Sequence, residues 1–163
     1  MNWDEYFFKM VDLVASKSKD KSTKVGAVIV GPDHRVVATG YNGFPMGVND
    51  IMGCKSCVDL NLIDKRYERP EKYYWTEHAE RNAIYSAACN GIALGGCTMY
   101  TQSAPCADCA RAIIQSGIIC VKVECIIRPG MGHWRESVHV GVTMMTEAGV
   151  EIIDNDGDKV VAV

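Results

Sequence analysis

The sequence predicts a layered α/β domain in which the strands of the second half of the chain run parallel. From residue 76 onward, helical patterns of apolar residues alternate with short apolar runs that are typical of buried strands. The helices are expected at residues 78–90, 106–116 and 133–148, and the strands at residues 97–101, 119–127 and 150–153. Gly117 and Gly149 directly follow the second and third of these helices, where a glycine commonly ends a helix.

The first part of the chain predicts one helix and two further strands. Apolar and aromatic residues recur at helical spacing near the N-terminus: Trp3, Tyr6, Phe7, Met10, Val11 and Val14. An apolar run at 25–30 and a second segment at 35–39 predict strands, and the turn at 31–34 joins them. Residues 40–75 are the least regular part, and we expect an irregular insertion at about 44–75 within a single domain spanning residues 1–163.

Composition and charge narrow the range of partners. The net charge is −3, whereas proteins that bind a nucleic acid polymer usually carry a positive surface, so such a polymer is not expected as a partner. No apolar run approaches the roughly 20 residues that span a bilayer, and the charged N-terminal segment does not resemble a signal peptide. We therefore expect a cytoplasmic protein (host cytoplasm if phage-encoded) without a membrane partner, in which the cysteines are buried thiols or metal ligands.

Two short motifs carry the candidate chemistry. They are His78-Ala79-Glu80 and Pro105-Cys106-Ala107-Asp108-Cys109, and each stands where a helix is expected to begin. Cys106 and Cys109 are three residues apart, so their thiols lie on one helical face and can share a metal ion. The positive end of the helix dipole stabilises their thiolates, and His78 can supply a third ligand.

Three protein ligands indicate a catalytic zinc site, because a structural zinc normally has four and leaves no position for water. Zinc lowers the pKa of a bound water to about 7, so hydroxide becomes available at neutral pH. Glu80, two residues beyond His78, is then the natural general base that takes the water proton and returns it to the leaving group. The alternative is a chance pairing of a core histidine with two buried thiols.

The combination of His-x-Glu with Pro-Cys-x-x-Cys is the signature of zinc-dependent nucleobase deaminases. At these residues the sequence resembles the cytidine deaminase superfamily, and within it the deoxycytidylate (dCMP) deaminases, closer to those of phages and bacteria than to animal ones. The resemblance extends to residues 18–20 and 25–30, and to Gly40-Tyr41-Asn42-Gly43-Phe44-Pro45. This last stretch separates dCMP deaminases from the deaminases of free nucleosides and tRNA.

The resemblance implies the hydrolytic deamination of dCMP to dUMP and ammonia, a step that supplies dUMP for thymidylate synthesis. It implies a three-layer α/β/α fold around a mixed five-stranded sheet, one catalytic Zn²⁺, and a homo-oligomer, commonly a hexamer. It also implies activation by dCTP with Mg²⁺ and inhibition by dTTP. The effector site would include Tyr41, Asn42 and Gly43.

The residues expected to bind the substrate are Ser22, Lys24, Asn42, Ala79, Ser103, Ala104 and Trp134. Ser22 and Lys24 either hold a 5′-phosphate or belong to a solvated loop. The amide of Asn42 either bonds a sugar hydroxyl or a base edge, or serves a turn beside Gly43. By the resemblance, backbone groups of Ser103 and Ala104 reach the cytosine amine.

The loop at 128–135 and two further segments leave alternatives open. Trp134 either stacks on the pyrimidine or anchors the core at a helix start, and Arg128 or Arg135 could meet phosphate. Cys54 and Cys57 either hold a second zinc or are loop thiols, since two thiols do not complete a tetrahedral site. For the basic residues of 64–72 three alternatives are open: they bind effector triphosphates, form a subunit interface or make a solvated surface. They are Lys65, Arg66, Arg69 and Lys72.

Two alternative functions remain at this point. The same zinc chemistry could act on dCTP, free cytidine or an adenosine in tRNA, although the negative net charge disfavours tRNA. A protein of a different class, a nucleotide-binding regulator with a structural zinc, is disfavoured because Glu80 is present and only three of the four ligands of a structural zinc are evident.

Overall fold

A computed structural model of the chain describes residues 1–49, 65–128, 130 and 132–160. Its centre is a five-stranded sheet in the order β2-β1-β3-β4-β5. The strands are β1 (Gly26–Val30), β2 (Val36–Tyr41), β3 (Thr98–Ser103), β4 (Cys120–Cys125) and β5 (Glu151–Ile153). β1 is antiparallel to β2 and β3, whereas β3, β4 and β5 run parallel. The expected mixed five-stranded sheet with parallel later strands is therefore confirmed.

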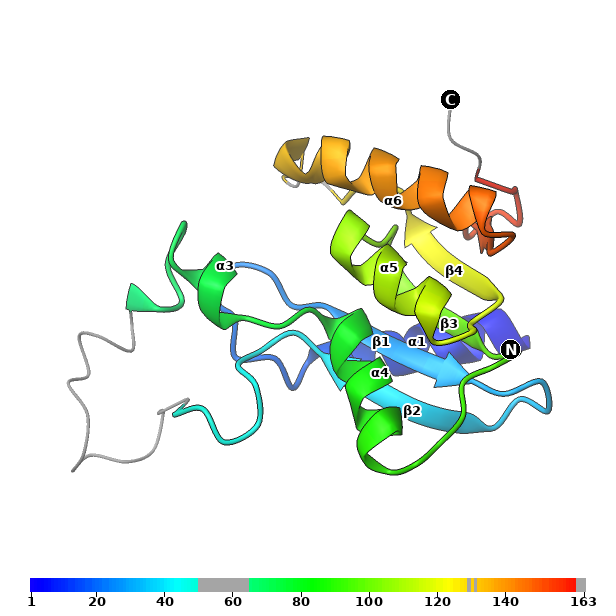
Figure 1. Cartoon of the computed structure of the whole chain (residues 1–163), viewed down its shortest axis with the longest axis horizontal. Coiled ribbons are helices and arrows are strands. Elements are labelled where there is room, and N and C mark those ends of the chain that lie inside the picture. The colour runs from blue at the N-terminus through cyan, green and yellow to red at the C-terminus, as the bar shows by residue number, and fades with distance from the viewer. Residues whose placement is uncertain (50–64, 129, 131, 161–163) are drawn as a thin grey trace.

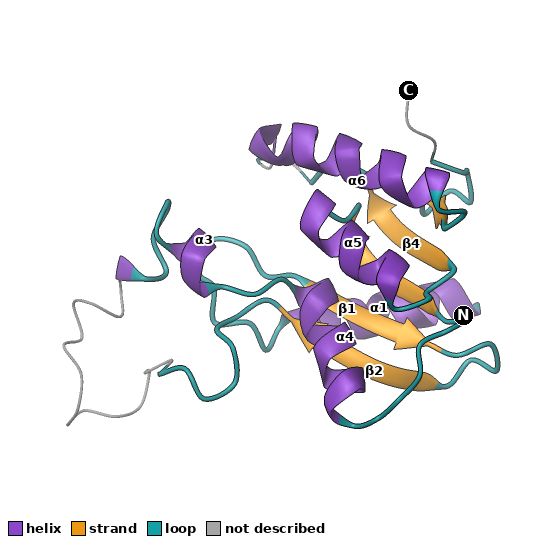
Figure 2. Ribbon diagram, viewed as in Figure 1, coloured by secondary structure: helices purple, strands orange, loops and turns teal. Residues whose placement is uncertain are grey.

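Helices cover both faces of this sheet (Figure 1, Figure 2). The helices are α1 (Trp3–Ala15), α3 (Lys72–Trp75), α4 (Ala79–Cys89), α5 (Ala107–Gln115) and α6 (Arg135–Glu147), and a 3₁₀ helix η1 (Gly132–Trp134) precedes α6. Asn2 begins α1, because its side chain accepts from the backbone N–H of Glu5 and the Glu5 carboxylate accepts from the Asn2 N–H.

The alternation of side chains along β1 produces the three layers. All five of its residues are buried, because successive side chains point to opposite faces of the sheet and both faces are covered. Ala27 and Ile29 join the larger core under α4, α5 and α6. Val28 and Val30 join a smaller core with residues of α1 and with Tyr100 of β3. The α/β/α arrangement that the resemblance implied is confirmed.

The structure differs from the sequence expectations mainly around residues 40–75. β2 extends to Tyr41, so Gly40 and Tyr41 are part of a strand. Gly43 then pairs with Glu77 through two backbone hydrogen bonds, which ties the end of β2 to the segment before α4. The short helix α3 was not predicted. Cys54 and Cys57, the candidates for a second zinc, lie outside the described residues.

Among the residues that the structure describes, no helix combines the length and the apolar character that crossing a bilayer requires.

Candidate active site

Two helix starts meet on the same face of the sheet and bring three metal-ligating groups together. His78 directly precedes α4, and Cys106 directly precedes α5, which carries Cys109 in its first turn. The Nδ1 atom of His78 lies 3.5 Å from the Sγ atom of Cys106 and 3.5 Å from that of Cys109. All three ligand atoms lie within 4.8 Å of one another. The geometry that the two motifs predicted is therefore present.

Two glycines allow the helix starts to come this close. A Cβ at Gly40 of β2 would lie 2.4 Å from the carbonyl oxygen of Ala79, so only a glycine lets the first turn of α4 rest on the strand. A Cβ at Gly141 of α6 would lie 2.6 Å from the carbonyl oxygen of Pro105, in the segment that leads into α5. Each half of the metal site thus depends on a glycine elsewhere in the chain.

Polar contacts surround the three ligands. The Glu77 carboxylate accepts from the backbone N–H of His78 at 2.9 Å and from the guanidinium of Arg81 at 2.6 Å. Arg81 also lies 3.5 Å from the carboxylate of Asp108, so it links the first turn of α4 to that of α5. The hydroxyl of Ser137 in α6 accepts from the backbone N–H of Ala107, which the side chain of Cys106 does not cap. These contacts orient the ligands.

The electrostatics of the three ligands suit a metal cation. A hydrogen bond from Cys109 lowers the pKa of Cys106 to about 4, and the same interaction raises the pKa of Cys109 well above its usual value. Burial lowers the pKa of His78, but the hydrogen bond to Cys106 and the carboxylate of Glu80 outweigh burial and raise it overall. The hydrogen bond between the two thiols thus favours the thiolate of Cys106, and a divalent cation would favour the thiolate form of both cysteines.

The donor set fits zinc. One imidazole and two thiolates are ligands that zinc prefers, and within the described part of the chain no other histidine, cysteine or carboxylate joins the cluster. A set of three protein ligands leaves one position of a tetrahedral site for water or substrate. Glu80 is not one of the three; its carboxyl lies in the same cavity, 5% exposed, and burial raises its pKa.

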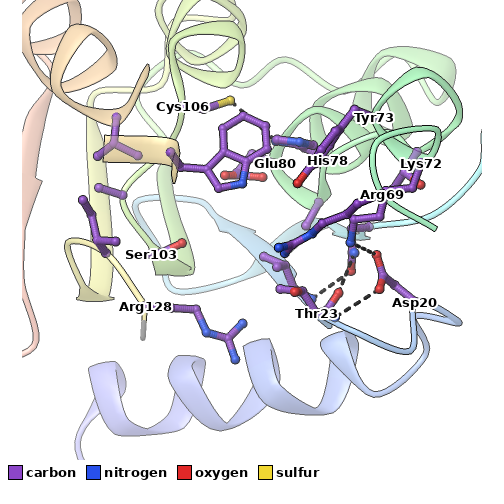
Figure 3. A pocket seen from close by; sticks show the side chains of 18 of the residues that line it. Asp20, Thr23, Arg69, Lys72, Tyr73, His78, Glu80, Ser103, Cys106 and Arg128 are labelled. Atoms are coloured by element: carbon purple, nitrogen blue, oxygen red, sulfur yellow. Dashed lines mark hydrogen bonds and ion pairs between the residues drawn. The ribbon is translucent and has the colours of Figure 1, made fainter. Parts of the chain in front are cut away.

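A cavity opens beside the ligands (Figure 3). His78, Glu80 and Cys106 lie at one end of it, and the ring of Trp134 stands edge-on to His78 with 5.3 Å between the ring centroids. The other end is polar and includes Asp20, Thr23, Arg69, Lys72 and Arg128. The cavity thus runs from a metal site to a group of cationic side chains.

The structure brings five of the seven expected substrate residues into this cavity. They are Asn42, Ala79, Ser103, Ala104 and Trp134. Ser22 and Lys24 do not line it, since the Ser22 hydroxyl bonds to Asp20 and Lys72, and the Lys24 ammonium points to the carbonyl of Ser16. Of the three expected effector residues only Asn42 lines the cavity, whereas Tyr41 is exposed on the edge strand.

Asn42 has a clear structural role. Its amide oxygen accepts from the backbone N–H of Val25 at 2.8 Å, and its amide nitrogen donates to the carbonyl oxygen of Thr23 at 2.8 Å. The side chain therefore ties the end of β2 to the loop before β1, and this loop forms one wall of the cavity.

Several cavity residues were not assigned to the site by sequence. Arg69, Lys72, Tyr73 and Thr76 come from the segment around α3. The concentration of basic residues at 64–72 was a signal, but it did not distinguish a cavity from a solvated surface. Tyr73 also bonds to His133 at 3.1 Å, and its ring meets that of Trp134 edge to face, which joins α3 to η1 beside the cavity.

Comparisons with known proteins agree with this geometry. Residues 1–125 match the family described as the cytidine and deoxycytidylate deaminase zinc-binding region. An uncharacterised deaminase of Aliivibrio fischeri is 40% identical over 150 residues, covering 92% of this chain and 91% of that protein. The deoxycytidylate deaminase of Mus musculus is 40% identical over 118 residues, covering 72% of this chain and 62% of the mouse protein.

Among solved structures, the dCMP deaminase from the cyanophage S-TIM5 in complex with dCMP and dUMP has a TM-score of 0.67 and 26% identity, and the match covers 92% of this chain and 94% of that chain. The bacterial and mouse relatives have the same identity to this chain, so its expected closeness to phage and bacterial members stays a prediction. The match to the family spans both motifs of the metal site, from His78 to Cys109. The chain belongs to the cytidine and deoxycytidylate deaminase family.

Proposed function

We propose that this protein catalyses the hydrolytic deamination of dCMP to dUMP and ammonia. The observation that carries this proposal is the arrangement of one cavity, with a zinc-type ligand cluster and Glu80 at one end and two arginines at the other. A nucleotide has a base at one end and a phosphate at the other, so the cavity matches the chemistry of a nucleoside monophosphate. Relatives named as deoxycytidylate deaminases support the same substrate.

The residues His78, Cys106 and Cys109 would hold the zinc, which supplies a Lewis acid that makes water nucleophilic near neutral pH. Glu80 accepts the proton of the attacking water on a carboxylate oxygen. It delivers that proton to N3 of cytosine as the water oxygen bonds to C4. It then takes the second proton from the new hydroxyl on C4 and passes it to the amino group, so that the C4–N bond breaks, ammonia leaves and C4 becomes the carbonyl carbon of uracil. Burial raises the pKa of Glu80, which makes its carboxylate a stronger proton acceptor.

Side chains on three sides would hold the base and the sugar. The hydroxyl of Ser103 points toward the cavity (Figure 3), and the neighbouring Ala104 also lines it, so their polar groups would lie near the amino group of cytosine. The ring of Trp134 would cover the pyrimidine. The hydroxyl of Thr76 is buried and has no hydrogen-bond partner among the described residues, so a sugar hydroxyl would satisfy it.

Arg69 and Arg128 would bind the 5′-phosphate in place of the expected Ser22 and Lys24. Both arginines line the end of the cavity away from the ligand cluster, and neither forms an ion pair with a carboxylate in the described ranges. One nitrogen of Arg128 donates to the carbonyl oxygen of Lys24, which holds the guanidinium across the cavity. Guanidinium groups recognise phosphate through paired, charge-assisted hydrogen bonds.

The finer expectations rest on the resemblance. They comprise the supply of dUMP for thymidylate synthesis, activation by dCTP with Mg²⁺, inhibition by dTTP, a homo-hexamer and a cytoplasmic location. The exposed ring of Tyr41, 43% accessible at the end of the edge strand, offers a surface for an effector base or a neighbouring subunit. Cys54 and Cys57 stay candidates for a second zinc.

The test is a substrate panel with zinc measured per chain. Purified protein is incubated with dCMP, dCTP, deoxycytidine, cytidine and a tRNA anticodon stem, and ammonia release and loss of cytosine absorbance are followed. We expect dCMP to be consumed fastest. A preference for the nucleosides would remove the role of the two arginines. If zinc is bound but no cytosine compound releases ammonia, the protein is instead a nucleotide-binding regulator.

A further inference from the structure

A buried ion pair forms part of the cavity wall at its cationic end. The ammonium of Lys72, in α3, lies 2.8 Å from the Asp20 carboxylate and 2.7 Å from the Ser22 hydroxyl. The side chain of Asp20 is 2% exposed and that of Lys72 is 7% exposed. A lysine this buried is unusual, and the two residues are 52 positions apart in the sequence. The pair therefore links two distant segments of the chain inside the cavity wall.

Asp20 also organises its own loop. One oxygen of its carboxylate accepts from the backbone N–H of Ser22 at 2.8 Å, from the Ser22 hydroxyl at 2.8 Å and from the N–H of Thr23 at 3.0 Å. The other oxygen accepts from Lys72. Burial raises the pKa of Asp20, but these hydrogen bonds outweigh it and lower the pKa overall, so the carboxylate is charged at neutral pH.

Both proposed phosphate-binding arginines depend on what this pair holds in place. Arg69 stands three residues before Lys72, so the position of its backbone follows that of α3. Arg128 donates to the carbonyl oxygen of Lys24, which ends the loop that Asp20 organises. Figure 3 shows Arg69, Lys72, Asp20 and Thr23 gathered on one side of the cavity and Arg128 on another.

Lys72 differs from Arg69 and Arg128 in whether a carboxylate neutralises its charge. Asp20 neutralises Lys72, and within the described chain no carboxylate forms an ion pair with Arg69 or Arg128. The two arginines together carry a charge that matches a phosphate monoester dianion, whereas Lys72 is already engaged with Asp20 and Ser22. Lys72 is thus placed to position other residues rather than to bind the substrate.

We propose that Asp20 and Lys72 are positioning residues that hold Arg69 and Arg128 at the spacing a nucleotide 5′-phosphate requires, and thereby set the preference for a nucleoside monophosphate over a nucleoside. This inference rests on the proposed function. It makes no change to the chemistry at C4, because neither residue belongs to the ligand cluster. It also explains why Ser22, expected to touch phosphate, bonds to both members of the pair instead.

The test compares Asp20→Asn and Lys72→Met with the wild-type holoenzyme. We expect KM for dCMP to rise about tenfold or more in each, while kcat stays within about twofold, because misplacement of binding groups weakens substrate binding without altering the reacting centre. Competitive inhibition by dUMP should weaken to a similar extent, whereas inhibition by deoxyuridine, which lacks the phosphate, should not change.

Three further variants distinguish a loss of positioning from a loss of structure. Asp33→Asn removes the ion pair of Asp33 with Arg35 on the surface, and its KM should equal that of the wild type. Ser22→Ala removes the hydroxyl that accepts from Lys72. Because Ser22 is exposed, this variant should fold even if Asp20→Asn does not. Its KM for dCMP should rise about threefold, because it loses one of the contacts of Lys72. Lys72→Arg, which retains the charge, should recover part of the affinity lost in Lys72→Met.

Two results would overturn the inference. One is an unchanged KM for dCMP in Ser22→Ala and in any folded variant of the pair. The other is an equal loss of inhibition by dUMP and deoxyuridine, which would indicate a general loss of structure. Failure of the proposed function is a different result, in which wild-type protein with bound zinc releases no ammonia from dCMP.

Discussion

A Cβ atom at Gly141 would lie 2.6 Å from the carbonyl oxygen of Pro105, so α6 contacts backbone immediately before the first metal-ligating cysteine. In an exposed helical position, replacing glycine by alanine stabilises a protein by up to about 1 kcal/mol. At Gly141 the sign should reverse, because the extra methyl meets backbone that cannot rotate away. The position of α5, and with it that of Cys106 and Cys109, therefore depends on a residue 35 positions after Cys106.

We expect Gly141→Ala to lower the free energy of unfolding by about 1–3 kcal/mol, the usual cost of overpacking, and to weaken zinc binding. Urea denaturation and competition with a zinc chelator measure the two effects. Gly95→Ala is the control, because a Cβ there would meet no atom within 4 Å. Equal stability of the two variants would show that α6 can shift away from α5 without cost.

Replacing Glu80 by glutamine should abolish most of the turnover and leave the metal in place. The amide has almost the shape of the carboxyl but cannot carry the proton, and a positioned general base contributes about 10²–10⁴-fold. Zinc per chain and kcat for dCMP are the measurements. Glu136→Gln, an exposed glutamate in the first turn of α6, should have wild-type values of both. A Glu80→Gln protein with full kcat would exclude the proton-transfer role.

Removing either arginine at the cationic end of the cavity should lower kcat/KM for nucleotides more than kcat/KM for nucleosides. We expect Arg69→Met and Arg128→Met each to lose about tenfold or more in kcat/KM for dCMP, since a charge-assisted contact contributes about 1.5–3 kcal/mol. Steady-state rates on dCMP and deoxycytidine check this. Arg35→Met, in the exposed turn between β1 and β2, is the control. Equal effects on both substrates would place the phosphate elsewhere.

The contribution of Asp20 to stability should depend on pH in one direction. Its pKa in the folded state is lowered, so the unfolded chain binds its proton more readily. The stabilisation is therefore fully present above the ordinary pKa of 3.8 and is lost as the pH falls through the lower pKa of the folded state. The difference in unfolding free energy between wild type and Asp20→Asn should be constant from pH 7 to about 5 and shrink below about pH 4. A difference that grows on acidification would contradict this.

Removal of zinc should destabilise the protein as well as inactivate it. A ligand that binds only the folded state stabilises it by about 2.7 kcal/mol when present at about 100 times its Kd. Chelation should therefore lower the midpoint of thermal unfolding, and added zinc should restore both the midpoint and the activity. In Cys109→Ser, one thiolate ligand is lost and the response to added zinc should be much weaker. An identical midpoint with and without zinc would exclude the metal from this cluster.

Sequence patterns predicted the elements that local chemistry controls. Helix starts at His78 and Cys106, the glycines after two helices and the buried character of β1 all follow from short-range preferences, and each was confirmed within a few residues. The candidate metal ligands could be predicted equally well, because the spacing of Cys106 and Cys109 places both thiols on one helical turn. The short helix α3 was missed, since four residues give too weak a periodic signal.

The residues proposed to bind the phosphate could not be predicted in this way. Ser22 and Lys24 carry the right chemical groups, but the sequence does not show which way a loop residue points, and both are turned to other partners. The buried pair of Asp20 and Lys72 joins segments 52 residues apart, and its members look in the sequence like ordinary solvated charges.

The amino-acid sequence was sufficient to predict the cluster of His78, Cys106 and Cys109, because zinc binding requires particular residue types at short, fixed spacings. Which residues line the rest of the cavity depends instead on how distant segments pack together. Contacts between distant segments, such as Gly141 with Pro105 and Asp20 with Lys72, arise only when the helices dock on the sheet. Such contacts have no characteristic spacing along the chain, so the folded structure alone reveals them.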